Sequence, residues 1–147
     1  MITNLAVQYY RNVTMNHIKK FGQIYTNSNV AKFMVDWLMS KNPSEIFDPA
    51  FGMGEFYYQS LKSKFKGKFK AKEIDVKSYN FFLKHSNTKQ LSLLNEDYFN
   101  IWSNNYECIV CNPPYLKFQN IENRDYIFSC LKNYLGIKVS GYTNMAS

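Results

Sequence analysis

The stretch Ile109-Val110-Cys111-Asn112-Pro113-Pro114-Tyr115 runs from apolar residues into an amide, two prolines and an aromatic ring. Ile109 and Val110 favour a buried strand, and because proline has no N–H to give to a sheet, the strand must end at Asn112. The prolines also restrict the backbone, which holds Asn112 and Tyr115 in a fixed relation. Ligands of open α/β sheets bind at the carboxyl ends of strands, so we expect a site here.

The residue types in this stretch suit a planar amino group. The side-chain oxygen of Asn112 and the carbonyl of Pro113 are two acceptors for its two hydrogens, and Tyr115 offers a ring face for stacking. An amine whose hydrogens are held out of its ring plane regains lone-pair density and becomes a better nucleophile without a strong base. The alternative is a proline-rich corner between a strand and a loop that carries no chemistry.

Upstream, the sequence predicts a strand over residues 45–48, followed by the turn Pro49-Ala50-Phe51-Gly52-Met53-Gly54. A helical pattern through Phe56 and Leu61 follows the turn, and strand, glycine turn and helix form the first half of a nucleotide-binding βαβ unit. Glycine at 52 and 54 leaves out the Cβ atoms that would keep a cofactor away from the backbone.

A second strand is expected where lysines alternate with other residues and lead into Glu73-Ile74-Asp75; these are Lys62, Lys64, Lys66, Lys68, Lys70 and Lys72. Alternation indicates a strand with one solvated face, and we favour charge that prevents aggregation over a DNA-binding ridge. Glu73 stands 25 residues after Asp48. An acidic residue at that separation in the sequence could accept hydrogen bonds from the two hydroxyls of a ribose.

A third strand is predicted over residues 91–95 and a fourth over 106–110, with helices at 78–85 and from about 120 to 135, ending at Gly136. Asp97 and Tyr98 follow the third strand. An acid beside an aromatic ring could accept from the amino group of a bound adenine and stack on its ring, although an exposed turn is the simpler alternative.

The amino-terminal part of the chain contains one strongly marked helix, which Asn27 or Ser28 would cap and Asn42-Pro43 would stop near Ser40. Its apolar residues recur at helical spacing, and we expect them to face the core; they are Val30, Phe33, Met34, Trp37 and Leu38. Residues 1–20 have no clean period and are expected to form an irregular or partly helical lead-in.

Length and charge limit the possible functions. The 147 residues suffice for one domain, and the net charge of +7 favours a polyanionic partner such as nucleic acid, with a merely solvated lysine-rich surface as the alternative. Three cysteines and no recognisable leader indicate a cytoplasmic protein. No metal is expected, because Cys108 and Cys111 lie in a predicted strand, and no apolar run reaches the ~20 residues of a membrane span.

In their order along residues 21–147, these motifs resemble the adenine-N6 DNA methyltransferases of restriction-modification systems. Phe21-Gly22-Gln23-Ile24-Tyr25-Thr26 is similar to the motif that meets the methionine part of the cofactor, and residues 48–56 to the glycine motif. Glu73 corresponds to the ribose acid, Asp97-Tyr98 to the adenine clamp, and residues 112–115 to the catalytic motif. Two positions depart from the family pattern: Asn27 stands where proline is usual, and Met53 where a smaller residue is.

The resemblance implies a Rossmann-like sheet, mostly parallel with helices on both faces, of which this chain supplies about four of seven strands. Residues 21–147 would be the amino-terminal part of a catalytic domain without a target-recognition region. The implied cofactor is S-adenosylmethionine, held by Tyr25, Thr26, Asp48, Pro49, Ala50, Gly52, Gly54, Glu73, Asp97 and Tyr98. The implied catalytic residues are Asn112, Pro113, Pro114 and Tyr115, and asparagine at the first of them favours adenine over cytosine.

The implied function is methylation of adenine N6 in double-stranded DNA, with the target base flipped out. A specificity subunit, a restriction subunit or the rest of the enzyme would be a partner. Two alternatives remain. Protein-glutamine and RNA-base methyltransferases share Asn-Pro-Pro-Tyr, and a truncated, inactive piece would bind cofactor or nucleic acid only with a partner.

Overall fold

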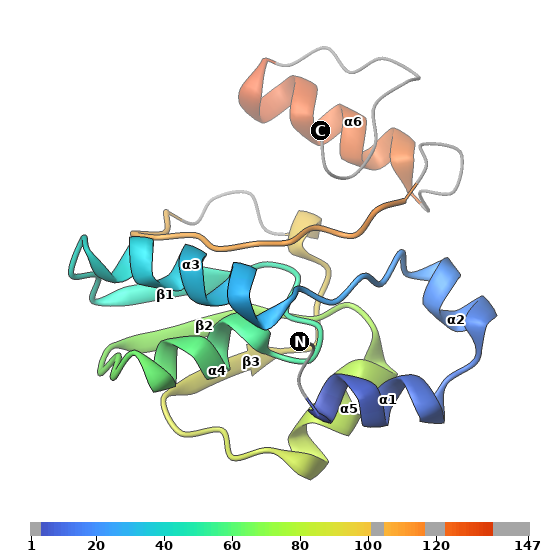
Figure 1. The fold of residues 1–147 in the computed structure, drawn as a ribbon. Coiled ribbons are helices and arrows are strands. Elements are labelled where there is room, and N and C mark those ends of the chain that lie inside the picture. Colours follow the sequence, from blue (N-terminus) through green and yellow to red (C-terminus); the bar gives the residue numbers. More distant parts are fainter. Residues whose placement is uncertain (1–3, 101–104, 117–122, 137–147) are drawn as a thin grey trace.

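A computed structural model describes residues 4–100, 105–116 and 123–136. Its sheet has three parallel strands in the order β1-β2-β3, formed by Glu45–Asp48, Lys68–Lys72 and Leu91–Leu94 (Figure 1). The register places Ile46 opposite Phe69, and Phe69 opposite Leu91. The three predicted strands and the α/β class are therefore confirmed.

Helices connect the strands and cover one face of the sheet. Helix α4 (Glu55–Lys62) joins β1 to β2, α5 (Val76–His85) joins β2 to β3, and α3 (Ser28–Met39) precedes β1. Side chains of these helices form one apolar core with Ile46, Phe69 and Leu91, and Figure 1 shows α3 and α4 on the same side of the strands. On the opposite face, Tyr106 stacks on Phe47 with ring centroids 3.8 Å apart.

The predicted fourth strand is shorter than expected. Among the described residues it forms one bridge, between Phe47 and Ile109, with Phe47 N–H donating to Cys108 O at 2.8 Å and Val110 N–H donating to Phe47 O at 2.9 Å. The direction is parallel, so this segment lies beside β1 where a fourth strand would pair. Before Phe47, the Glu107 carboxylate rather than a backbone carbonyl accepts from the N–H groups of Ser44 and Glu45, and after it Pro49 has no N–H to continue the ladder.

The amino-terminal segment is more regular than the sequence suggested. It forms α1 (Asn4–Asn12) and α2 (Met15–Lys20), and α1 packs on α5. Tyr9 is buried, with its ring 5.3 Å from that of Phe81 in an edge-to-face contact. Residues before the first motif therefore contribute to the core.

The marked helix is present, but only part of its predicted apolar stripe faces the core: Leu38 is buried, and Met34 packs partly buried against the core. Helix α3 begins after Asn27, whose side chain accepts from Asn29 N–H at 2.9 Å, so the predicted cap is confirmed. The buried residues of α3 are Ala31, Val35 and Leu38, whereas Val30, Phe33 and Trp37 are 51%, 74% and 62% exposed.

Packing between helices explains this difference. Helix α3 lies against α4, and its fully buried residues, Ala31 and Val35, are smaller than the exposed Phe33 and Trp37, as close packing of two helices favours. Hydrophobic size predicts that the large apolar residues are buried. Close contact between two helices instead favours small residues at the interface. Phe33 and Trp37 lie on the outer surface of the helix, whereas Leu38 remains buried.

The last helix, α6 (Arg124–Leu135), ends at Gly136 as predicted, in the left-handed conformation with φ of +66°. The first residues of the predicted range, 120–122, lie outside the described residues. Figure 1 shows α6 beyond the segment 105–116, on the side away from the three strands. In the part of the chain that the structure describes, no helix is both long and apolar enough to span a membrane.

Gly54 provides a test of the packing at the start of α4. Its φ is +72°, and an added Cβ would lie 2.7 Å from Phe51 Cζ and 2.8 Å from Phe82 Cε2. Gly54→Ala should therefore lower the free energy of unfolding by about 3 kcal/mol, through backbone strain plus overpacking.

Gly136→Ala is the matched control for Gly54→Ala. Its φ is +66°, and an added Cβ would meet nothing within 4 Å. Gly136→Ala should therefore lower the free energy of unfolding by only about 1 kcal/mol, the cost of placing a residue with a Cβ atom in the left-handed conformation. Urea denaturation measures the free energy of unfolding of both variants. An equal loss of stability in the two would show that the rings of Phe51 and Phe82 can move aside at no cost.

Candidate functional site

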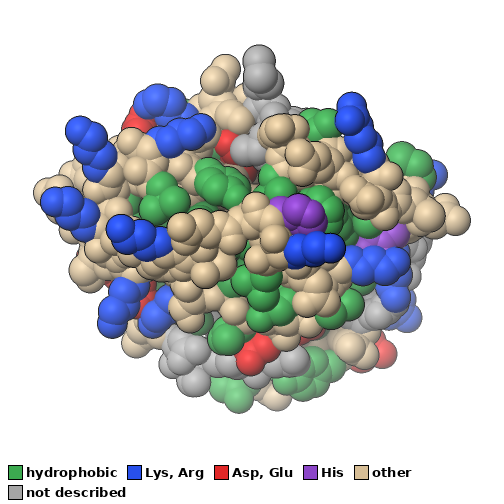
Figure 2. Space-filling view, turned by 90° about the horizontal axis from the view of Figure 1, so that it is seen from below, with side chains coloured by type: hydrophobic (Ala, Val, Ile, Leu, Met, Phe, Trp, Pro, Cys, Tyr) green, Lys and Arg blue, Asp and Glu red, His purple; other side chains and the backbone are tan. Residues whose placement is uncertain are grey.

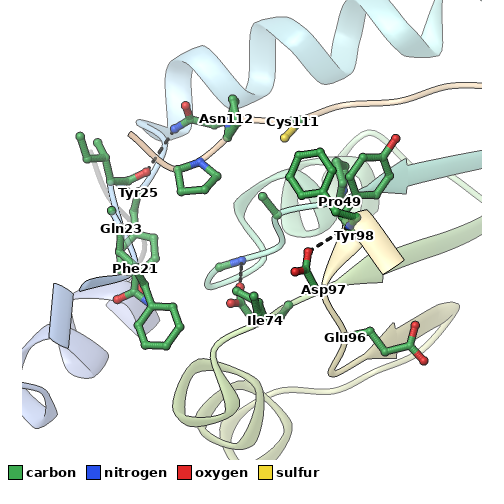
Figure 3. Close-up of a pocket in the computed structure, with 18 residues that line it drawn as sticks. Phe21, Gln23, Tyr25, Pro49, Ile74, Glu96, Asp97, Tyr98, Cys111 and Asn112 are labelled. Carbon is green, nitrogen blue, oxygen red and sulfur yellow. Dashed lines mark hydrogen bonds between the residues drawn. The ribbon is translucent and has the colours of Figure 1, made fainter. Parts of the chain in front are cut away.

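A cleft with a volume of about 260 Å³ lies at the carboxyl ends of the strands (Figure 3). Five segments that are distant in sequence meet there, and each follows a strand or precedes a helix. The lining residues are Phe21 to Tyr25; Pro49, Ala50 and Gly52; Glu73 and Ile74; Glu96 to Phe99; and Cys111 to Pro114. Figure 3 shows Phe21, Gln23 and Tyr25 across the cleft from Asp97 and Tyr98.

The structure brings most of the predicted site residues to this cleft. Those in its lining are Tyr25, Pro49, Ala50, Gly52, Glu73, Asp97, Tyr98, Asn112, Pro113 and Pro114. Thr26, Asp48, Gly54 and Tyr115 are not part of the lining. Gly54 is the amino-terminal cap of α4 and is surrounded by aromatic rings, so its small size serves packing.

The glycine turn is held close to the segment that crosses over it. Gly52 has a φ of +56°, and a Cβ there would come within 3.1 Å of Tyr25 Cε1. The Gly52 N–H donates to Glu73 Oε2 at 2.7 Å, and Phe51 N–H donates to Lys72 O at 3.0 Å. Glycine is therefore required for close approach as well as for the backbone conformation.

Glu73 links this turn to the start of α5. One of its oxygens accepts from Gly52, the other accepts from Asp75 N–H at 2.8 Å, and the side chain still lines the cleft. Burial raises the pKa of Glu73 to about 7, although the backbone N–H donors oppose this shift. Each carboxylate oxygen keeps a second lone pair, so the group remains able to accept from a ligand hydroxyl.

Asp48 is completely buried beneath the cleft. Its Oδ1 accepts from Ala50 N–H at 3.0 Å, whereas its Oδ2 has no partner among the described residues. Burial raises the pKa of Asp48 to about 8, and the charge of Glu73 adds to the shift. A buried carboxyl with an unsatisfied oxygen is well suited to receive a cation or a hydrogen-bond donor.

Asn112 is held by the segment before α3. Its Nδ2 donates to Ile24 O at 3.1 Å and to Thr26 Oγ1 at 3.0 Å. Both amide hydrogens are therefore used, and no described residue donates to its side-chain oxygen. The group left to accept from a ligand is that oxygen.

The segment before α3 and the segment that carries Asn112 also contact each other near Tyr115. Tyr115 N–H donates to Gly22 O at 3.2 Å, and a Cβ on Gly22 would lie 2.9 Å from Leu116 Cγ. The ring of Tyr115 is 56% exposed outside the cleft, which leaves its face open to a ligand.

The residues after β3 form another wall of the cleft. Asp97 Oδ1 accepts from Phe99 N–H at 3.0 Å and starts the short 3-10 turn η1 (Tyr98–Asn100). Burial raises the pKa of Tyr98, whose ring lies 5.9 Å from that of Phe47. The aspartate and the tyrosine are thus fixed side by side in the cleft.

Sequence reasoning missed the contribution of Ile74. The side chain is 54% exposed although it follows a strand directly, and it lines the cleft. The sequence did carry a signal for this role: an apolar residue stands between two acidic ones at the end of a strand, where no buried core position is expected.

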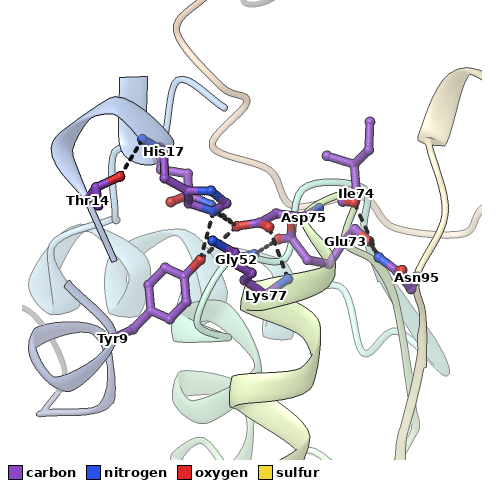
Figure 4. Close-up of polar contacts among 10 residues, drawn as sticks. Tyr9, Thr14, His17, Gly52, Glu73, Ile74, Asp75, Lys77 and Asn95 are labelled. Carbon is purple, nitrogen blue, oxygen red and sulfur yellow. Dashed lines mark hydrogen bonds and ion pairs between the residues drawn. The ribbon is translucent and has the colours of Figure 1, made fainter. Parts of the chain in front are cut away.

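A group of polar residues around Asp75 was also missed (Figure 4). Asp75 Oδ2 accepts from Tyr9 OH, His17 Nε2 and Gln23 Nε2, each at 2.7 Å. Its Oδ1 accepts from Lys77 N–H at 3.0 Å and caps α5. Burial raises the pKa of Asp75, but these hydrogen bonds outweigh it and hold the pKa below the ordinary value. The carboxylate thus anchors α1, α2 and the cleft-lining segment to the end of β2.

Asp75→Asn should lower the free energy of unfolding by about 3 kcal/mol, because an amide cannot accept all of these hydrogen bonds. Tyr9→Phe, which removes one donor, should cost about 1 kcal/mol. Asp125→Asn is the control for the loss of charge, since that side chain is 94% exposed. Urea denaturation at pH 7 compares the three, and a loss for Asp75→Asn no larger than for Asp125→Asn would contradict the anchoring role.

A smaller cavity of about 30 Å³ adjoins the cleft and shares Ile24, Tyr25, Ala50, Gly52 and Asn112 with it. Thr26 lines only the smaller cavity, as does Glu55. Glu55 is buried; its Oε1 accepts from Gln59 Nε2 at 2.7 Å, and its Oε2 has no partner among the described residues. Across the described ranges, no group of three or more His, Cys, Asp and Glu side chains could hold a metal ion.

Comparison with known proteins gives consistent matches. Residues 8–129 match the N-6 DNA Methylase family. The Type II methyltransferase M.AccI of Acinetobacter calcoaceticus is 31% identical over 149 residues, covering 98% of this chain but 27% of that protein. The chain thus spans about a quarter of that relative's length.

Among solved structures, a putative RNA methyltransferase of Pyrococcus horikoshii superposes with a TM-score of 0.57 at 16% identity. The similarity covers 85% of this chain and 65% of that one. At this identity the likeness concerns the fold alone, and it supports a Rossmann-like α/β sheet.

Proposed function

Because this chain belongs to the N-6 DNA methylase family, we propose that its cleft binds S-adenosylmethionine and serves methyl transfer to N6 of an adenine flipped out of DNA. The observation that carries the proposal is the Asn112 side chain, whose amide hydrogens are already bound by Ile24 and Thr26. Its oxygen and the Pro113 carbonyl are then the acceptors for the two hydrogens of the target amine.

The charge of the cleft fits the cofactor. Glu73 and Asp97 line it together with Glu96, which Lys72 partly neutralises at 3.1 Å, and Asp48 lies beneath it. No lysine or arginine occurs among the described lining residues, although the whole chain carries +7. A dinucleotide, which this kind of sheet can also bind, would bring phosphates into an acidic cleft. A ligand with a sulfonium and an ammonium group is attracted instead.

Each part of the cleft suits one part of that cofactor. Glu73 would accept from the ribose hydroxyls, Asp97 from the adenine amino group, and Ile74 and Tyr98 would pack on the adenine ring. Asp48, through its unsatisfied oxygen, would stabilise positive charge at the methionine end. When bound, the cofactor supplies an electrophilic methyl group on sulfur.

The residues at 112–115 would activate and align the target base. Tyr115 offers its exposed ring for stacking, which offsets part of the cost of flipping the base. Asn112 and Pro113 would hold the amino hydrogens so that the nitrogen lone pair points along the line of attack. The bound cofactor would supply the methyl group and keep the electron pair of its bond to sulfur, while Asn112 and Pro113 would hold the amine until the proton it loses leaves to solvent.

Sequence-independent attraction to DNA would come from the lysines. Figure 2 shows lysine and arginine side chains spread over the face it displays, without a single dense patch. On β2, Lys70 pairs with Glu45 at 2.8 Å and Lys72 with Glu96 at 3.1 Å, so these two serve the protein itself. The remaining charge would raise the local concentration of DNA.

Site recognition would then be supplied outside these motifs, by further residues of the enzyme or by a specificity or restriction subunit. The relative at 31% identity is much longer than this chain, which motivates this part of the proposal. Residues 21–147 would form the amino-terminal part of the catalytic domain.

Two experiments test the function. Calorimetry should detect binding of S-adenosylmethionine and none of NADP or ATP, and binding of the phosphate-bearing ligands alone would overturn the cofactor assignment. A transfer assay with a labelled methyl group should then label adenine-containing DNA and leave RNA and glutamine-containing peptides unlabelled. Labelling of RNA or peptide alone would assign the same chemistry to another substrate.

A further inference from the structure

We propose that Thr26 is a positioning residue, whose hydroxyl, together with the Ile24 carbonyl, sets the orientation of the Asn112 carboxamide so that its oxygen faces the amino group of the target base. This inference rests on the function proposed above and adds a residue that acts through Asn112. It concerns a side chain that the resemblance assigned to cofactor binding.

The hydrogen bonds distinguish the two possible orientations of the amide. In the observed one, Asn112 Nδ2 lies 3.1 Å from Ile24 O and 3.0 Å from Thr26 Oγ1. If the amide were reversed, its oxygen would face the Ile24 carbonyl oxygen, and two acceptors would meet. The hydroxyl of Thr26 adds a second acceptor for the same NH2 group, which keeps both of its hydrogens engaged.

Thr26 is itself fixed in place by its neighbours. The next residue, Asn27, caps α3 through its side chain, and Asn27 O accepts from Ala31 N–H at 2.9 Å. On the other side, Gly22 O is bound by Tyr115 N–H. The segment from 22 to 27 is therefore anchored at both ends, so the Thr26 hydroxyl is held at a defined place relative to Asn112.

The position of Thr26 separates this role from cofactor binding. Thr26 does not line the main cleft; it lines the smaller cavity, which Asn112 also borders. A residue that orients the catalytic amide should affect the turnover rate, whereas one that holds the cofactor should affect its dissociation constant. The two roles therefore predict different kinetic changes.

The kinetic test uses Thr26→Val, which removes the hydroxyl at nearly constant shape, and Thr26→Ser, which retains it. Thr26→Val should lower kcat about 10- to 100-fold, as is usual when a group that orients an active residue is lost, with the Kd of S-adenosylmethionine changed less than about threefold. Thr26→Ser should keep kcat within about threefold. Thr88→Val is the matched control on an exposed loop and should leave both quantities unchanged.

A measurement that needs no turnover accompanies the kinetics. Nitrogen–proton correlation spectra show the side-chain NH2 of Asn112, which Asn112→Asp identifies by its loss. These two signals should be shifted and slow to exchange in the wild type and in Thr26→Ser, and should move toward free-amide values in Thr26→Val. A thermal melt of each variant establishes that it is folded.

The outcomes separate the two proposals. If wild-type protein methylates no DNA, the proposed function fails, while the spectra still decide whether Thr26 orients Asn112. If Thr26→Val keeps its kcat and only loses affinity for S-adenosylmethionine, or if its Asn112 signals stay as in the wild type, the positioning role is overturned.

Discussion

Asn112→Ala should reduce methyl transfer to DNA by about a thousandfold or more, with the Kd of S-adenosylmethionine changed only a few-fold. The substitution removes the acceptor for one amino hydrogen of the target base, and with it the alignment of the nitrogen lone pair. The cofactor loses little, because Glu73, Asp97 and the glycine turn lie on other segments of the cleft. Single-turnover transfer and calorimetry on the same preparation measure the two quantities.

Two further variants refine this result. Asn105→Ala makes the same truncation at an exposed position on the approach to the catalytic stretch and should leave transfer unchanged. Asn112→Asp keeps two acceptors but loses the donors to Ile24 and Thr26, so it should also fail because the carboxylate would face a carbonyl. Preserved turnover with a large loss of cofactor affinity in Asn112→Ala would show that the residue binds cofactor instead.

The convergence of the motifs was predictable because it follows from topology. In a parallel sheet all strands end at the same edge, so residues placed just after three predicted strands must lie near one another. Glu73 and Asp97 satisfy this rule and line the cleft, and Asp48, the last residue of β1, is buried at the same edge. The strand limits were read from apolar alternation and from turn residues, and β1, β2 and β3 fall where those signals place them.

Side-chain geometry across distant segments was not predictable in the same way. The sequence predicts no role for Asp75 beyond its place at the end of Glu73-Ile74-Asp75, yet its side chain accepts from Tyr9 and His17, whose positions depend on how α1 and α2 fold back. The motif predicts Asn112 as catalytic, but the groups that bind its amide hydrogens stand 86 and 88 residues earlier. No local pattern reports such pairings, because they arise only when the segments pack.

The exposed face of α3 shows a second limit of sequence reasoning. Helical periodicity identifies a helix correctly, but it does not decide between a face of large apolar residues and a neighbouring face of small ones. Here Ala31 and Val35 are fully buried and Phe33 is exposed. The decision depends on how closely α4 approaches, which is a property of the partner helix.

Asp48→Asn should change stability and cofactor binding in opposite directions. Burial raises the pKa of Asp48 to about 8, against 3.8 for an ordinary aspartate, so between these values the folded protein binds a proton that the unfolded chain lacks. The stability of the cofactor-free protein therefore falls as the pH rises from about 4 to 8. The amide of the Asp48→Asn variant carries no charge and does not titrate, so the stability of the variant should not decrease over this pH range on account of residue 48. Its free energy of unfolding at pH 8 should therefore exceed that of the wild type by several kcal/mol.

Cofactor binding should respond with the opposite sign. A sulfonium or ammonium group near Asp48 stabilises its carboxylate, so the pKa is lower in the complex and a proton is released on binding. The affinity of the wild type should then rise between pH 6 and 7.5, by at most about tenfold per pH unit for each proton released. The amino group of the cofactor, with an α-amino pKa of about 8, stays mostly protonated up to pH 7.5, so its own titration weakens the trend without reversing it.

The pH series on Asp48→Asn isolates this residue from its neighbour. The pKa of Glu73 is also raised, to about 7, so the affinity of the variant for S-adenosylmethionine should still rise with pH, but less steeply than that of the wild type. Affinity at pH 7.5 should drop at least tenfold, because an amide does not offer the charge that attracts the cofactor. Calorimetry in buffers of different ionisation enthalpy counts the released protons. An unchanged proton count in Asp48→Asn would remove Asp48 from the binding reaction and leave it a purely structural group beneath the cleft.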